Sequence, residues 1–136
     1  FWDLKYRRGG LVDVEFIAQY LQLRHAHEHP EVLSANTADA LARLVGAGVL
    51  PGNVGEELQS AIGLWHRLFG MLRLTIGQKF DEASLPAGIS RTLARAGGVG
   101  DFAELKALVA ATAARVAAHY QDMIDIPARE LAARLT

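Results

Sequence analysis

The residues best suited to chemistry stand near the beginning of the chain, where cations precede a glycine pair: Lys5, Arg7, Arg8, Gly9 and Gly10. A helix is predicted to start directly after this pair. The first N–H groups of a helix have no partner within it, and the helix dipole places positive charge at the same end. The segment could therefore bind an anion, with phosphate as the natural candidate. The alternative is that the glycines simply begin a helix beside a solvated basic strip.

Asp13 lies in the first turn of this predicted helix, where the dipole favours a carboxylate. At about 100° per residue, it falls on a broad and mostly apolar face. The other members of that face are Phe16, Ile17, Tyr20, Leu23 and Arg24. A charge directed toward an apolar side needs a partner. We expect Lys5, Arg24 or a bound group to supply it.

The opposite arc of the same helix carries polar side chains three or four residues apart: Glu15, Gln19 and Gln22. Two interpretations fit this arc. It is either a polar face in contact with solvent or a wall that meets another domain.

Other candidate chemistry has less support. His25 and His29 have the i, i+4 spacing that could share a metal ion on a helix, but no carboxylate is placed to complete the site, and Pro30 should end the helix. The sequence contains no nucleophile elbow, Walker loop or dinucleotide fingerprint. We therefore expect neither a bound metal nor catalytic residues in this chain.

The elements that position these residues are predicted to be helices, because apolar residues recur at helical spacing between glycine and proline breaks. The predicted helices are residues 11–27, a short helix capped by Asn36 or Thr37 and ended by residues 46–48, residues 54–76, a short helix around Ile89 and Leu93, and a long helix from Asp101 to Tyr120. Pro51 and Gly52 are expected to turn the chain, and residues 78–87 to form a loop. The predicted fold is all-α, an antiparallel bundle of about five helices plus a short C-terminal helix.

The two long helices carry the predicted core. The inward stripes are Leu58, Ile62, Trp65, Phe69, Leu72 and Ile76 on one helix, and Phe102, Leu105, Val109, Thr112, Val116 and Tyr120 on the other. Gly63 and Gly70 lie on a different strip of the first of these helices, where we expect another backbone to approach closely. Asp101 and Glu104 have the spacing of a capping box.

The chain is expected to form one helical domain, residues 1–136, because this length is too short for a core plus a separate catalytic lobe. Residues 1–10 are expected to be an extended lead-in from a catalytic domain outside this chain. Residues 126–136 are expected to form a tail helix that begins near Pro127 and either docks on the bundle or frays. A start at Phe1 without an initiator methionine suggests a piece of a longer protein.

Composition narrows the class of partner and the location. The chain has 14 basic and 15 acidic residues, so its overall charge does not favour nucleic acid or an anionic membrane. Cysteine is absent, which excludes disulfides and thiolate metal sites and is compatible with the cytoplasm. No apolar run reaches the roughly 18 to 20 residues of a membrane-spanning helix. We expect a cytoplasmic protein.

The opening motif resembles a known family. Lys5, Gly9-Gly10, Asp13-Val14-Glu15-Phe16-Ile17 and Gln19-Tyr20-Leu21 are similar to the segment that follows the nucleotidyltransferase domain in glutamine synthetase adenylyltransferases. The likeness continues through residues 23–30, Asn36-Thr37 and residues 41–50, and after that only helical pattern and spacing agree. It implies a helical bundle like the substrate-binding domains of nucleotidyltransferases.

The resemblance also implies a function for the longer protein. Members of the family have two halves, one of which attaches AMP from ATP to a tyrosine of glutamine synthetase while the other removes it by phosphorolysis. Gln19-Tyr20-Leu21 is more similar to the C-terminal, adenylylating half, and the deadenylylating half is the alternative. The implied partners are glutamine synthetase, a PII-type signalling protein and the protein's own nucleotidyltransferase domain.

ATP and Mg²⁺ are the cofactors that the resemblance implies for the full-length enzyme. The metal-binding aspartates of the family belong to a Gly-Ser and Asp-x-Asp arrangement in the catalytic domain, and this sequence lacks it. We therefore expect this chain alone to be inactive and to bind neither cofactor.

The resemblance places a set of residues, here called the interdomain face, beside the absent active site: Lys5, Arg7, Arg8, Gly9, Gly10, Asp13, Glu15 and Gln19. Lys5 is expected near the nucleotide phosphates, and the acids are expected to orient basic groups. The alternative is a non-catalytic docking or signal-receiving module for glutamine synthetase or a nitrogen-signalling protein. In that case, exposed cations of the long helices would matter more, including Arg67, Arg73 and Arg115.

Overall fold

The computed structural model describes residues 1–75 and 81–135, and within these ranges it contains helices and no β-strand. The α-helices are α1 (Leu11–His25), α2 (Thr37–Gly46), α3 (Gly52–Thr75), α4 (Ala87–Ala96), α5 (Phe102–Tyr120) and α6 (Ile126–Leu135). Two short 3-10 turns, η1 (Pro30–Val32) and η2 (Glu82–Ser84), and a π-helical segment, η3 (Gln121–Asp125), connect them. The predicted all-α fold is confirmed. Ile76 and residues 78–80 of the predicted loop lie outside the described residues.

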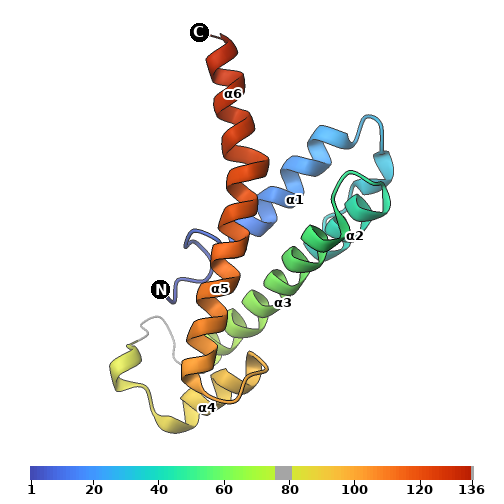
Figure 1. Ribbon diagram of the computed structural model, residues 1–136. Coiled ribbons are helices and arrows are strands. Elements are labelled where there is room, and N and C mark those ends of the chain that lie inside the picture. The colour runs from blue at the N-terminus through green and yellow to red at the C-terminus, as the bar shows by residue number, and fades with distance from the viewer. Residues whose placement is uncertain (76–80, 136) are drawn as a thin grey trace.

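Helix α3 is the centre of the bundle, because it contacts α1, α2, α4 and α5 (Figure 1). Its side chain Trp65 is fully buried, and the other α-helices of the bundle each bring leucine, isoleucine or valine to the same core. The largest fully buried contributors include Ile17, Leu41, Leu44, Leu58, Leu68, Leu93, Leu105 and Val109. The buried stripe of α3 differs from the predicted one. Leu64 and Leu68, which were not predicted, are buried, whereas the predicted Phe69 is only half-buried.

The predicted helix starts rest on side-chain caps. Asn36 Oδ1 accepts a hydrogen bond from the Asp39 N–H at 2.9 Å, and Asp101 Oδ1 accepts one from the Glu104 N–H at 2.8 Å. The Gly100 N–H, one residue before the cap, donates to Glu104 Oε2 at 2.8 Å. A capping box would use the N–H of Asp101, so the box differs from the predicted one. The turn expected at Pro51 and Gly52 is instead the first turn of α3.

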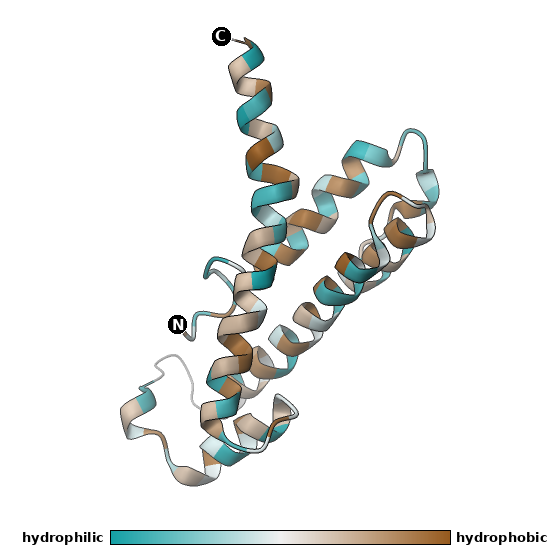
Figure 2. Cartoon of the chain, viewed as in Figure 1, coloured by the Kyte–Doolittle hydropathy of each residue, from teal (hydrophilic) through white to brown (hydrophobic). Residues whose placement is uncertain are grey.

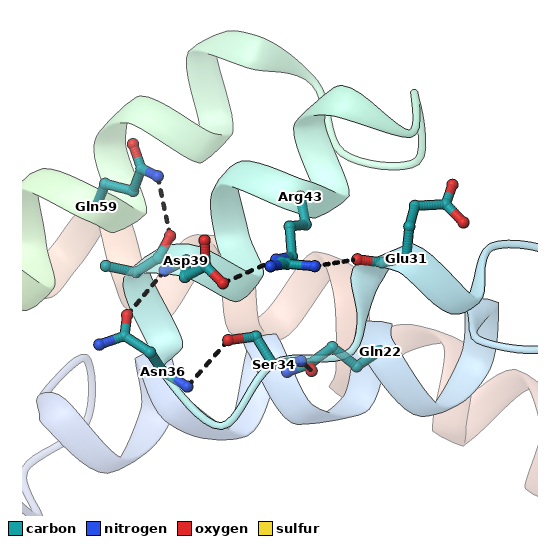
Figure 3. A network of polar contacts seen from close by, with 8 residues as sticks. Gln22, Glu31, Ser34, Asn36, Asp39, Arg43 and Gln59 are labelled. Atoms are coloured by element: carbon teal, nitrogen blue, oxygen red, sulfur yellow. Dashed lines mark hydrogen bonds and ion pairs between the residues drawn. The ribbon is translucent and has the colours of Figure 1, made fainter.

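The connection between α1 and α2 is held by a network of polar contacts (Figure 3). Gln22 is buried, where its Oε1 accepts from the Ser34 N–H at 2.8 Å. Arg43 reaches back to the Glu31 carbonyl at 2.9 Å and pairs with Asp39 at 2.7 Å. Hydrogen bonds from Ser34 and then from Arg43 hold the pKa of Asp39 below its ordinary value.

The predicted orientation of α1 is wrong. Its buried residues are Leu11, Val14, Ile17, Ala18, Leu21 and Gln22. Phe16 and Leu23, predicted on the apolar side, are 45% and 79% exposed. Helix α1 carries apolar side chains on most of its circumference, so spacing alone could not identify the side that its contacts with α2, α3 and α5 bury.

The close helix approach predicted at Gly63 and Gly70 is also absent. A Cβ on Gly70 would meet nothing within 4 Å, and one on Gly63 would meet only Nη1 of Arg67, at 3.2 Å. The close approach of backbones occurs instead at Gly9, where a Cβ would overlap the carbonyl of Ala113 in α5.

Helix α6 neither folds back onto the bundle nor starts a separate segment. It continues α5 through η3 and projects from the other helices, and among the described residues it contacts only η3 (Figure 1). The Ile126 N–H bonds to the Gln121 carbonyl, a π-type spacing that falls just before Pro127, which lacks a donor. Figure 2 shows hydrophobic residues along this projecting rod, and Leu131 and Leu135 are exposed. No helix in residues 1–75 and 81–135 has the length and apolar character needed to cross a membrane.

Two matched leucine substitutions test this division between bundle and projection. Leu41→Ala, at a fully buried site, should lower the free energy of unfolding by about 2–5 kcal/mol, because it leaves a cavity. Leu135→Ala, at a side chain that is 79% exposed, should change it by less than about 0.5 kcal/mol. Urea denaturation of the 136-residue chain measures both values. Equal losses would contradict the described core.

Candidate functional site

The opening residues are folded against the bundle and do not form the extended lead-in that was predicted. Leu4 is buried in the core, which draws the chain inward. The Arg7 N–H bonds to the Asp3 carbonyl and the Gly10 N–H to the Arg7 carbonyl, both at 2.9 Å. Residues 4–10 therefore form successive turns that lead directly into α1.

Contacts at the very start of the chain secure the same segment to α5 and η2. The Trp2 ring stacks on Phe102 with centroids 5.5 Å apart, and its indole N–H donates to Glu82 at 3.1 Å. Glu82 also pairs with Lys106 of α5. Hydrogen bonds from Lys106 and then from Trp2 lower the pKa of Glu82.

The turns of the opening segment form hydrogen bonds with backbone N–H groups that an anion would need. The N–H groups of Leu11 and Val12, in the first turn of α1, donate to the carbonyls of Leu4 and Lys5 at 2.8 and 2.9 Å. The Gly9 N–H donates to Asp13 Oδ2 at 2.6 Å. These groups are therefore already satisfied, and the phosphate site predicted from free N–H groups is wrong on this point.

Gly9 connects the opening segment to both long helices of the bundle. Its φ is +82°, a left-handed conformation that side chains rarely adopt, and it is buried. Its carbonyl accepts the indole N–H of Trp65 at 3.1 Å, so α3 holds the opposite side of the same peptide segment. Its missing side chain allows the contact with Ala113 of α5.

Asp13 has partners within the chain, and they are neither Lys5 nor Arg24, the two side chains that were predicted. Besides the Gly9 N–H, its Oδ2 lies 3.7 Å from Nη1 of Arg8, and its side chain is only 16% exposed. Lys5 and Arg24 are not bound to it. Asp13 therefore stabilises the glycine turn and fixes the position of Arg8.

Arg8 links the opening segment to the far end of α5. Its guanidinium lies 4.6 Å from the centroid of the Tyr120 ring, and Nη2 is 4.0 Å from Asp125 of η3. The side chain remains 60% exposed. It borders an open groove of about 540 Å³ that Gln121, Asp125, Arg129 and the alanines of α5 also line.

The remaining members of the interdomain face are dispersed. Lys5 lies with its ammonium 5.3 Å from the Tyr6 ring and pairs with no carboxylate in the described part of the chain. Arg7 donates to the Phe1 carbonyl at 2.9 Å. Glu15 lies two residues from Asp13 and so points to a different side of α1. The structure thus joins Arg8, Gly9, Gly10 and Asp13, and separates them from Glu15 and Gln19.

Gln19 belongs to another hollow. With Gln22, Leu23, Leu33 and Ser34 it lines a depression of about 320 Å³ between α1 and the turn that follows it. The predicted solvated arc of Glu15, Gln19 and Gln22 is wrong for Gln22, whose amide is buried and bonded. The described residues gather no group of three or more His, Asp or Glu side chains that could hold a metal ion.

Sequence reasoning missed the partners supplied by distant helices: Trp65, Ala113, Tyr120, Asp125 and Arg129. Two features of the sequence could have indicated some of these partners. A buried tryptophan needs an acceptor for its indole N–H, and Asp125 and Arg129 have the i, i+4 spacing of an acid and a base on one helix face. Neither signal identifies the opening segment as the other partner.

Comparisons with known proteins agree with the resemblance of the opening motif. The family model described as GlnD PII-uridylyltransferase matches residues 2–124. The chain belongs to this family. No solved structure matches the chain significantly.

Curated relatives are similar over most of this chain. One from Bradyrhizobium diazoefficiens is 39% identical over 125 residues, covering 92% of this chain and 13% of the relative. Others are from Rhodopseudomonas palustris strain TIE-1, 42% identical over 123 residues (90% and 12%), and Xanthobacter autotrophicus, 39% identical over 127 residues (93% and 13%). Each is named a bifunctional glutamine synthetase adenylyltransferase/adenylyl-removing enzyme. The chain spans about an eighth of the length of these relatives. The resemblance to glutamine synthetase adenylyltransferases that the sequence indicated is confirmed.

Two glycines in similar backbone conformations test the contact at Gly9. Gly48 has φ +78° and nothing within 4 Å of a Cβ, so Gly48→Ala should cost only the left-handed strain, about 1–2 kcal/mol. Gly9→Ala should cost that strain plus about 1–3 kcal/mol, because the methyl group overlaps the Ala113 carbonyl. Chemical denaturation of both variants gives the difference. A Gly9→Ala loss no larger than that of Gly48→Ala would show that the backbones are not in contact.

Proposed function

We propose that this chain is the helical domain of a protein that transfers AMP from ATP to glutamine synthetase, and that it stands beside the nucleotidyltransferase domain that performs the transfer. The similarity to relatives with that printed activity, at 39–42% identity over about nine tenths of the chain, carries the proposal. The sequence itself has no nucleotidyltransferase motif, so the chemistry belongs to another part of such a protein.

The finer assignments follow the resemblance of the opening motif. We assign the chain to the adenylylating half on Gln19-Tyr20-Leu21, with a tyrosine of glutamine synthetase as the acceptor. The matching family model is named for a PII-uridylyltransferase, which supports a PII-type signalling protein as a second partner. A cytoplasmic location is part of the same proposal.

The exposed surface near Arg8 supports contact with another domain. Phe16 is an apolar side chain that the bundle leaves 45% exposed. Its ring lies 5.9 Å from that of Tyr120, which is the ring under Arg8, so an apolar surface adjoins the charged groove. Helix α6, which carries Arg129 of the groove, also exposes Ile126 and Leu131. Exposed apolar groups near charged ones are typical of interfaces. We propose the nucleotidyltransferase domain as the occupant.

Within this arrangement, the cations of the interdomain face have different roles. Lys5 has an ammonium group without a carboxylate partner among the described residues, and a lysine can serve phosphate as a point charge. We assign it to the nucleotide phosphates. Arg8 is oriented by Asp13 and Asp125 and faces the domain contact. Mg²⁺ has no fitting set of carboxylates among the described residues and is assigned to none of them.

Substitution of Lys5 in the full-length protein tests this role. A charge-assisted hydrogen bond contributes about 1.5–3 kcal/mol, so Lys5→Gln should slow AMP transfer to glutamine synthetase roughly 10- to 100-fold. Incorporation of labelled AMP measures the rate, and circular dichroism should show unchanged helix content. Arg91→Gln, which removes one positive charge from the exposed surface of α4, should transfer at nearly the rate of the unaltered protein.

The outcomes separate the parts of the proposal. If the unaltered full-length protein attaches no AMP to glutamine synthetase, the proposed activity is wrong. If it does, but Lys5→Gln and Arg91→Gln transfer at equal rates, only the role of Lys5 is wrong. Asp13 is unsuitable for this test, because it supports the fold through Gly9.

A further inference from the structure

A third hollow, of about 350 Å³, lies between α3 and α5 and has no role in the function proposed above. We call it the α3–α5 groove. Its residues on α5 are Leu108, Thr112 and Arg115, whereas the open groove at Arg8 uses Ala114, Ala117 and Ala118. At about 100° per residue the centres of these two sets lie roughly 130° apart around α5. The two hollows therefore use different sides of the helix.

The floor of the α3–α5 groove is formed by buried side chains, two of which are apolar. Ala61 and Leu64 of α3 and Thr112 of α5 line it, and all three are buried. Small side chains at Ser60 and Ala61 leave the space open. The volume is at the lower end of the roughly 300–1,000 Å³ that small-molecule pockets occupy. The groove can hold a compact ligand with an apolar body.

The position of Arg67, at one part of the rim, is fixed by two contacts. Its Nε donates to the carbonyl of Ala96, the last residue of α4, at 3.0 Å. Its Nη1 lies where a side chain on Gly63 would begin, since a Cβ there would be 3.2 Å away. Gly63 thus provides room for the guanidinium on the surface of α3. The Nη groups make no hydrogen bond or ion pair with another described residue and can bind a ligand.

Arg115 adds a second guanidinium to the rim and makes no ion pair among the residues that the structure describes. The carboxylate that lines the groove, Glu57, is already engaged, because its Oε2 lies 2.6 Å from Nε2 of His119. Its charge is therefore directed toward His119. The groove is left with an excess of positive charge above an apolar floor.

We propose that the α3–α5 groove binds a small molecule that carries a phosphate or carboxylate group on a short apolar body. Arg67 and Arg115 donate to the anionic oxygens, an arrangement in which guanidinium groups bind both kinds of anion well. Leu64 and Thr112 contact the body of the ligand. The small volume of the groove favours a small molecule over a protein segment.

Titration of the ¹⁵N-labelled 136-residue chain with three probes, followed by NMR, tests the proposal. Phenyl phosphate and benzoate carry the two candidate anions on the same ring, and benzyl alcohol is the uncharged match. Saturable shifts are expected at Thr112, Arg115 and the Arg67 Nε–H. The tighter of the two anions identifies the class of ligand, and benzyl alcohol should bind at least about ten-fold more weakly, as the loss of a charged hydrogen bond predicts.

Two arginine substitutions provide the matched control. Arg115→Gln should weaken binding of the tighter probe by about ten-fold or more, because one charge-assisted donor is lost. Arg91→Gln, at an exposed arginine of α4 outside the groove, should leave it unchanged. Both sites are exposed, so both variants should fold.

Three results would overturn the proposal. These are the absence of saturable shifts in the groove at millimolar probe, equal affinity of the Arg115→Gln and Arg91→Gln variants, and tighter binding of an aspartate-rich peptide than of either anion. The last result would identify a protein-docking surface instead. None of them bears on AMP transfer, which is measured separately in the full-length protein.

Discussion

The backbone of Gly9 packs so closely against Ala113 of α5 that there is no room for a side chain at this position. The organisation of the opening segment depends on this contact. The Trp65 indole binds its carbonyl and the Asp13 carboxylate binds its N–H. Both polar groups of a buried residue are thereby satisfied, which removes the cost of burying them. Because Asp13 also holds Arg8, the same turn directs that guanidinium onto Tyr120 at the start of the projecting rod.

This constraint changes the interpretation of the glycine pair in this segment. A glycine pair before a helix suggested free backbone donors for phosphate, yet those donors are consumed by the turn and by Asp13. Under the proposed function, contact with a nucleotide would come from side chains, and Lys5 is the cation that we assign to it. The glycines support the fold of the opening segment. The α3–α5 groove uses other residues of α5, and the anion site proposed there is separate.

The sequence predicted features that depend on local residues and failed where distant ones decide. The helices and the caps at Asn36 and Asp101 follow from spacing and from short-range hydrogen bonds, and they were predicted correctly. The buried side of α1 could not be inferred, because apolar residues surround it. Among many glycines, spacing selected Gly63 and Gly70, whereas the tight contact at Gly9 requires Ala113, which is more than a hundred residues away in the chain. The partners of Arg8 were missed for the same reason.

Hydrogen exchange in the native state tests the central claim most directly, because it reports on the two bonds that hold Gly9. The structure predicts that the Gly9 amide and the Trp65 indole N–H exchange as slowly as core amides such as that of Leu68, since each is bonded and buried. Exchange of both groups at the rate of a freely exposed amide would show that the opening segment is not held between α3 and α5, and would contradict the account.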